Sequence, residues 1–154
     1  MIDITQLVKV YDGFRAVDGL SLRVETGQIL GLVGPNGAGK TTTLRCLAGI
    51  IPPTSGHITI AGFDLHTHPI EARQRLAFVP DEPHLFDHLT ALDHLTLFAR
   101  LYGVTDGPTR AETLLEEAEL VDQRLSFPSE LSRGMKQKLV VACALLHRPE
   151  VLVL

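Results

Sequence analysis

The stretch that decides the fold spans residues 34–41 and reads Gly34-Pro35-Asn36-Gly37-Ala38-Gly39-Lys40-Thr41. It matches the pattern GxxxxGK[ST] at every required offset. The run before it, Gln28–Val33, is short and nearly all apolar, as expected for a parallel strand covered on both faces. The run after it, Thr41–Ala48, reads as a helix that ends at Gly49. The sequence therefore predicts a strand, a glycine-rich turn and a helix, which is the setting of a phosphate-binding loop.

The chemistry of phosphate binding explains the residue types of this loop. Glycines let the backbone turn sharply and point successive N–H groups at phosphate oxygens. The following helix adds the positive end of its dipole, about half an elementary charge. We expect Lys40 to reach the β- and γ-phosphates of a nucleotide and the Thr41 hydroxyl to ligate Mg²⁺. The alternative is a glycine-rich turn that binds no ligand.

Composition limits the remaining possibilities. The chain has 154 residues, enough for one ordinary core, and its net charge of -4 without a basic run argues against a nucleic-acid face. Its longest wholly apolar run, Leu139–Leu146, is far shorter than the ~20 residues that span a bilayer. The start shows no secretion signal, so we expect a soluble protein whose membrane role requires a partner. Cys46 and Cys143 are expected to be buried free thiols.

The rest of the sequence predicts short strands first and helices later. The expected strands are Ile2–Val10, Leu20–Val24, His57–Ile60, Leu76–Val79 and Val151–Leu154. The expected helices are Ile70–Arg75, Ala91–Tyr102 with Thr90 as its cap, Arg110–Glu119, and a long helix that Ser132 caps and that runs to about Leu146. The N-terminal strands predict a small, mostly antiparallel sheet beside the nucleotide site.

A second motif follows the helical segment and reads Leu131-Ser132-Arg133-Gly134-Met135-Lys136-Gln137. Alone, it is explained equally well as a helix cap. Together with Gly34–Thr41, it makes the chain resemble the nucleotide-binding domain of the ABC ATPases, in which LSGGQ-like residues follow the phosphate loop through a helical subdomain. The resemblance covers the whole chain and rests on the order of the motifs.

The resemblance implies an α/β fold with a P-loop NTPase core and a mostly parallel sheet. It adds an N-terminal antiparallel β-subdomain and an inserted α-helical subdomain, and the C-terminal part of the core is missing. We expect one partial ABC ATPase domain over residues 1–154. Residues 1–80 would form the β-subdomain and P-loop core, residues 81–134 the switch loop and helical subdomain, and residues 135–154 the signature helix and the start of the Walker B strand.

The resemblance also implies roles for single residues. Tyr11 lies where an aromatic ring stacks on the adenine of ATP; the alternative is a tyrosine that plugs the sheet edge. The expected catalytic residues are Lys40, Ser132 and Gly134, the last two contacting the γ-phosphate held by another copy. A head-to-tail homodimer, or a paired ATPase subunit, follows from this arrangement. The residues expected to hold the triphosphate are Gly34, Pro35, Asn36, Gly37, Ala38, Gly39, Lys40, Thr41 and Thr42.

Two positions depart from the family pattern. Asp81 stands where the family usually has a glutamine, and we expect it to ligate Mg²⁺ together with Thr41, because a carboxylate is also a hard oxygen donor. Arg133 replaces the first glycine of the signature pair, and we expect it to point away from the phosphate because Gly134 keeps the close approach. A metal cluster of Asp81 with nearby histidines is the alternative to polar residues on an exposed loop and helix face; these histidines are His84, His88 and His94.

In the family, the strand corresponding to Val151–Leu154 is followed by an aspartate that positions Mg²⁺ and a glutamate that activates water. A histidine comes later, and another strand lies between the phosphate-loop strand and the strand at Leu154. These residues are absent here, so we expect a fragment of a longer ATPase that binds ATP weakly at best and does not hydrolyse it.

The expected function of the parent is that of an ATP-binding subunit that drives transport, of the export type, through separate transmembrane permease subunits. It would be cytoplasmic and peripheral on the inner face of the cell membrane. Two alternatives remain: a soluble ABC-type ATPase acting on ribosomes or DNA, and a non-catalytic nucleotide-binding module. The acidic balance counts against a nucleic-acid partner.

Overall fold

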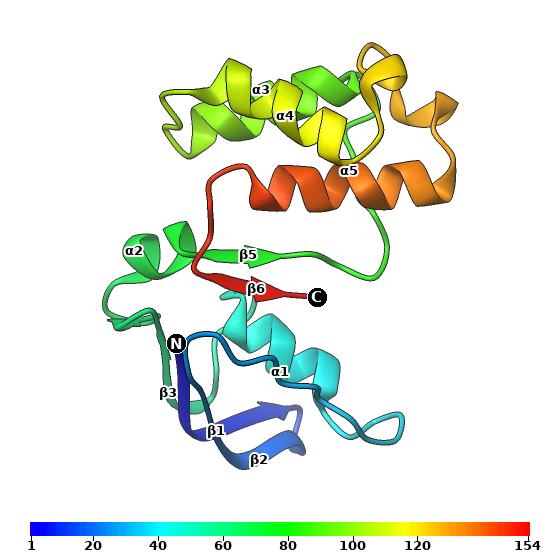
Figure 1. Ribbon diagram of the computed structural model, residues 1–154. Coiled ribbons are helices and arrows are strands. Elements are labelled where there is room, and N and C mark those ends of the chain that lie inside the picture. Colours follow the sequence, from blue (N-terminus) through cyan, green and yellow to red (C-terminus); the bar gives the residue numbers. More distant parts are fainter. The chain divides into compact units, whose positions relative to one another are not determined.

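The computed structural model describes residues 1–154 and divides the chain into two compact units. The first unit comprises Met1–Ala77 with Val153, and the second comprises Phe78–Leu152 with Leu154. Strands and two helices build the first unit, whereas helices dominate the second (Figure 1). The predicted α/β fold class, with an antiparallel sheet and a helical part, is confirmed.

An antiparallel sheet with the order β2-β1-β3-β4 forms the first unit. Its strands are β1 (Ile2–Tyr11), β2 (Phe14–Val24), β3 (Ser55–Ile60) and β4 (Phe63–Asp64). Strand β1 is central and buries Ile4 and Leu7, while β3 buries Ile58 and Ile60. Gly56 lies where β3 passes β1 with φ at +93°, and a β-carbon there would collide with the carbonyl of Gln6. Only glycine therefore fits this crossing.

Two helices complete the first unit. Helix α1 (Lys40–Leu47) begins directly after the glycine-rich loop and ends before Gly49, which takes φ at +67°. This left-handed glycine is the usual end signal of a helix. Helix α2 (Pro69–Gln74) starts with a proline, whose missing N–H costs nothing at a helix start. It lies against β3 and β4.

The strand predicted over Gln28–Val33 is wrong. These residues form no strand and pair with none of the strands in residues 1–154. Ile29 and Val33 are almost fully exposed, at 102% and 94%. A strand exists only when a neighbour supplies hydrogen bonds, so apolar composition alone does not form one. The other core strands, β5 (Leu76–Phe78) and β6 (Val151–Val153), do pair and form a two-stranded sheet.

The second unit is a helical cluster around one apolar core. Its elements are α3 (Ala91–Leu101), α4 (Gly107–Glu117), the 3₁₀ turns η1 (Val121–Gln123) and η2 (Pro128–Glu130), and α5 (Arg133–Leu145). The core is built from small and branched side chains, as close helix packing requires. Its fully buried members are Ala91, Leu95, Ala111, Leu115, Leu120, Leu139 and Leu146.

Local signals predicted the starts of α3 and α5 and the buried thiols correctly, whereas α4 starts at Gly107 and not at Arg110. Thr90 caps α3 and shares a reciprocal pair of bonds with Asp93, while Ser132 Oγ accepts a bond from Met135 N at 3.2 Å. Both cysteines are free and buried. Burial raises the pKa of the Cys143 thiol to about 12, so this group is an inert core side chain.

Candidate nucleotide-binding site

The glycine-rich loop packs against the β1–β2 hairpin. Residues 34–39 turn sharply into α1, and Ala38 N donates to Pro35 O at 3.2 Å within the turn. Gly39 adopts φ of +83°, and a β-carbon at this position would collide with the carbonyl oxygen of Ala16 in β2. Glycine is therefore required twice over, for its backbone angle and for its contact with the hairpin.

Lys40 folds back over this loop. Its Nζ donates to Gly34 O at 2.7 Å and to Pro35 O at 2.8 Å. The ammonium group is thus held beside the loop. An ammonium carries three donors and no acceptor, so it suits an anionic ligand.

The N-terminus of α1 is open. Gly39, the N-cap, offers no side-chain bond, and the first turn contains no acidic residue. Thr43 N donates to Gly39 O at 2.8 Å, so the amides of Lys40, Thr41 and Thr42 precede the first intrahelical bond. These amides and the positive end of the helix dipole form a site that favours an anion.

Tyr11 ends β1 on the same hairpin, opposite Phe14, and its side chain is 43% exposed. The Nζ of Lys9 lies 5.0 Å from the centre of the Tyr11 ring and donates to Pro52 O at 2.8 Å. The sequence motifs did not point to Lys9 as a neighbour of the Tyr11 ring. Its spacing of two residues from Tyr11 could have indicated the contact, because side chains at i and i+2 of a strand share one face.

The remaining predicted site residues belong to the second unit. Ser132 and Gly134 are exposed at the start of α5, and a β-carbon on Gly134 would meet nothing within 4 Å. The amide of Met135 is taken by Ser132 Oγ, and that of Lys136 by Ser132 O at 2.9 Å. The amides of Arg133 and Gly134 precede these bonds, so part of this helix end is open to an anion.

The donors predicted for Mg²⁺ have suitable chemistry. Thr41 carries an exposed hydroxyl and Asp81 an exposed carboxylate, and Mg²⁺ prefers such hard oxygen ligands. Mg²⁺ usually takes one or two protein ligands beside substrate phosphates.

The histidines form no metal site, because residues 1–154 contain no group of three or more His, Cys, Asp or Glu that could hold a metal. The expectation that His94 lies on an exposed face is wrong, since it is 1% exposed. Its Nε2 accepts a bond from Phe86 N at 2.9 Å, and its Nδ1 lies 2.7 Å from Thr90 O. Those two backbone partners satisfy the ring and explain its burial.

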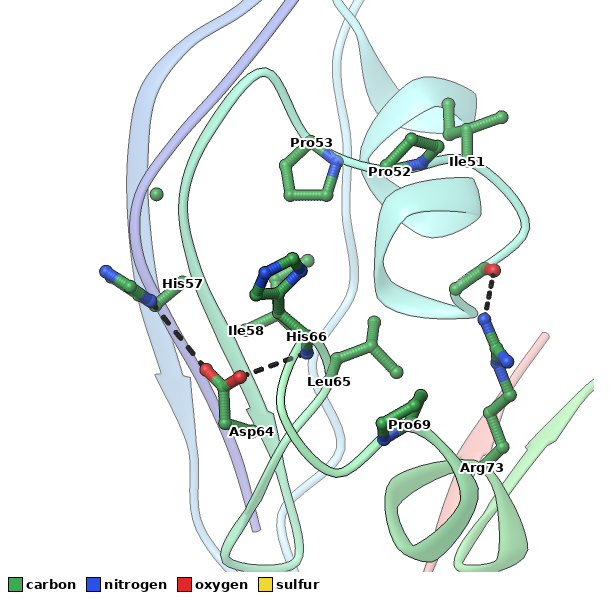
Figure 2. Close-up of a pocket in the computed structure, with 12 residues that line it drawn as sticks. Ile51, Pro52, Pro53, His57, Ile58, Asp64, Leu65, His66, Pro69 and Arg73 are labelled. Atoms are coloured by element: carbon green, nitrogen blue, oxygen red, sulfur yellow. Dashed lines mark hydrogen bonds and ion pairs between the residues drawn. The ribbon is translucent and has the colours of Figure 1, made fainter.

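A separate hollow of about 320 Å³ lies in the first unit between the end of α1, β3 and α2 (Figure 2). Two of its polar side chains, Arg73 and Asp64, are hydrogen-bonded within the first unit. Arg73 donates to Gly49 O at 2.9 Å, and Asp64 accepts bonds from the amides of His66 and Thr67 at 3.0 and 2.9 Å. The bond from the Thr67 amide is the main reason that the pKa of Asp64 is lowered. The bond from Arg73 attaches α2 to the end of α1.

None of the helices combines the length and the apolar character that crossing a lipid bilayer requires.

Comparisons with known proteins agree with this geometry. The family model described as "ABC transporter" matches residues 17–154. Among curated relatives, the Nod factor export ATP-binding protein I of Burkholderia pseudomallei is 44% identical over 99% of this chain and 51% of its own length. The bacitracin transport ATP-binding protein BcrA of Bacillus licheniformis is 38% identical over 100% of this chain and 50% of its own length. The chain thus spans about half the length of the curated relatives it matches.

Solved structures show the same fold. An ATP-binding subunit of an ABC transporter superposes with a TM-score of 0.89 at 34% identity, covering 97% of this chain and 63% of that one. An ATP-binding cassette solved as a dimer in a post-hydrolysis state, with ADP and Pi, superposes with a TM-score of 0.88 at 24% identity. This match covers 99% of this chain and 72% of that one.

Proposed function

Because the chain belongs to the ABC transporter family, we propose that residues 34–42 bind the triphosphate of ATP and that Tyr11 stacks on its base. The observation that carries this proposal is the open start of α1 beside the Lys40 ammonium. Mg²⁺ would be held by the Thr41 hydroxyl, and it would neutralise charge on the phosphates.

The proposed task is to power export of a small molecule through separate membrane-spanning subunits, on the inner face of the cell membrane. Support comes from the relatives, which include proteins named for Nod factor export and for bacitracin transport. Hydrolysis is proposed for a protein of the relatives' length. The chain of residues 1–154 is proposed to bind ATP weakly and without turnover.

Two copies are proposed to act head to tail. In each copy, Ser132 and the open amides of Arg133 and Gly134 would contact the γ-phosphate that the other copy holds. Such a pair is isologous, so one interface completes two sites.

Purification of the natural protein under mild detergent, through a tag, tests the proposed task. We expect membrane-spanning chains to co-purify and ATP hydrolysis in the eluate to be lost in Lys40→Ala. Ribosomal RNA or DNA in the eluate without membrane-spanning chains would contradict the export role and favour the soluble alternative. For residues 1–154 alone, phosphate release clearly above that of Lys40→Ala would contradict the absence of turnover.

A further inference from the structure

The aromatic ring at the proposed base site has a charged neighbour on one of its faces. Lys9 and Tyr11 lie two residues apart near the end of β1, and Lys9 Nζ lies 5.0 Å from the Tyr11 ring centre. This distance is within the roughly 6 Å over which a cation is attracted to an aromatic face. Tyr11 is still 43% exposed, so a ligand has room to reach it.

The ammonium is held in place by the loop that follows the phosphate-binding helix. Lys9 Nζ donates to Pro52 O at 2.8 Å. Because the acceptor is a backbone carbonyl, its position depends on the loop and not on a side-chain rotamer. The long lysine side chain is therefore fixed at both ends, by the strand and by the carbonyl.

The same loop is bonded to β1 on either side of Lys9. Thr54 N donates to Val8 O at 2.8 Å, and Val10 N donates to Thr54 Oγ1 at 3.0 Å. Lys9 is also close enough to α1 for its charge to act on Cys46. Burial raises the pKa of the Cys46 thiol, and the positive charge of Lys9 offsets part of that rise. Hydrogen bonds thus join the end of β1 to the loop after α1 and hold Lys9 between them.

We infer that Lys9 is a positioning residue for base recognition: its ammonium, held by Pro52 O, occupies one face of the Tyr11 ring and leaves the opposite face to the nucleotide base. This inference rests on the proposed ATP site. A cation on one face also draws ring electrons towards it, which makes the other face a better partner for an electron-rich purine. Lys9 itself contacts neither base nor phosphate.

Comparing two ligands separates this role from a general effect of charge. Dissociation constants of residues 1–154 for Mg-ATP and for Mg-tripolyphosphate are measured by NMR titration, and their ratio reports the contribution of the nucleoside, base and ribose together. Because Lys9→Met removes the group that occupies one face of the ring and fixes its orientation, it should lower the preference for ATP about two- to fivefold. Lys9→Arg, which keeps the cation, should retain it.

Arg15→Met is the matched control, because it removes one positive charge from the same hairpin, where Arg15 pairs with Asp18. It should leave the ratio unchanged. In a Tyr11→Leu background, Lys9→Met should have no further effect on the ratio, since the ring through which it acts is gone. Lys9→Gln serves the same test if Lys9→Met does not fold.

The outcomes distinguish failure of the proposed role of Lys9 from failure of the proposed ATP site. A wild-type chain that prefers ATP, together with a Lys9→Met variant of unchanged ratio, overturns the role of Lys9 and leaves the ATP site standing. A Lys9→Met effect that persists in Tyr11→Leu also overturns it. A wild-type chain that binds ATP no better than tripolyphosphate overturns base stacking and the role of Lys9 together.

Discussion

Two helix starts in this chain treat their backbone amides in opposite ways. In α3, every amide of the first turn has an acceptor within the protein. These bonds are Ala91 N to Ser126 O at 3.0 Å, Leu92 N to Arg124 O at 2.9 Å, and Asp93 N to Thr90 Oγ1 at 3.2 Å. In α1, the N-cap is a glycine without a side-chain bond, and no acidic residue occupies the first turn. The contrast indicates that the first-turn amides of α3 stabilise the fold, whereas those of α1 are left open to a ligand.

Helix α5 is intermediate between them. Ser132 satisfies the amide of Met135, as Thr90 does that of Asp93, but no acidic side chain lies in the first turn. Two further amides stay open there. The cap makes the helix start stable by itself, and the open amides suit a phosphate delivered by another copy. The more open start of α1 suits its proposed role of holding the triphosphate, and the partly capped start of α5 suits its proposed contact with the γ-phosphate held by another copy.

The largest expected effect concerns the cation beside α1. Lys40→Ala should weaken Mg-ATP binding about 10- to 100-fold, because hydrogen bonds from a charged donor are worth about 1.5–3 kcal/mol each. NMR or calorimetric titration measures the change. Lys138→Ala, which removes an exposed lysine paired with Glu119 in the second unit, is the control and should bind as the wild type does. Equal losses in both variants would show that only net charge matters.

The second prediction concerns a variant that gives the start of α1 the first-turn carboxylate found in α3. Thr42 and Asp93 occupy the same third position of their helices, so Thr42→Asp places a carboxylate at the open start. It should stabilise the ligand-free chain by about 0.3–1 kcal/mol through the helix dipole. ATP binding should fall at least about tenfold, because like charges repel. Thermal unfolding and titration of Thr42→Asp and Thr42→Asn check both signs, and unchanged ATP affinity would contradict the phosphate site.

The third prediction concerns the loss of the N-terminal cap of α3. Thr90→Ala removes the acceptor for Asp93 N and should lower the free energy of unfolding by about 1 kcal/mol, with ATP affinity unchanged. Ser132→Ala should cost a similar or smaller amount, since its cap lacks a reciprocal carboxylate. Denaturant unfolding gives these numbers. A Thr90→Ala variant as stable as the wild type would show that the cap contributes nothing.

The smallest effect is a pH dependence. Hydrogen bonds from Thr90 hold the pKa of Asp93 below its ordinary value of about 3.9. The stability this carboxylate contributes is therefore complete above that value and is lost as the pH falls through the lower, folded-state pKa. Asp93→Asn should make the acid loss of stability shallower, measured by urea unfolding between neutral pH and pH 3. An unaltered acid profile in Asp93→Asn would refute the assignment.

What the sequence predicted well is local. The caps at Thr90 and Ser132, the glycine turn and the helix after it each follow from residues within a few positions of one another, and all are present. The strand expected over Gln28–Val33 failed because pairing depends on a neighbour elsewhere in the chain. The apolar pattern describes what such a segment prefers and not what lies beside it.

The site was predicted to the same limit. The offsets of the phosphate loop made Gly39 and Lys40 candidates, but they did not predict the close approach of Gly39 to Ala16 or the carbonyls that hold Lys40. Burial of His94 was missed because both of its partners are backbone atoms, which have no sequence signature. The contact of Lys9 with Pro52 O joins positions 43 residues apart, and no pattern in the sequence marks it.

We propose that the start of α1 binds phosphate and that the start of α3 does not. Amide chemical shifts of the ¹⁵N-labelled chain, followed as Mg-ATP is added, test it most directly. We predict saturable shifts at the amides of residues 34–42, with those of residues 91–93 unmoved. Shifts absent from residues 34–42, or equal at both helix starts, would contradict the account.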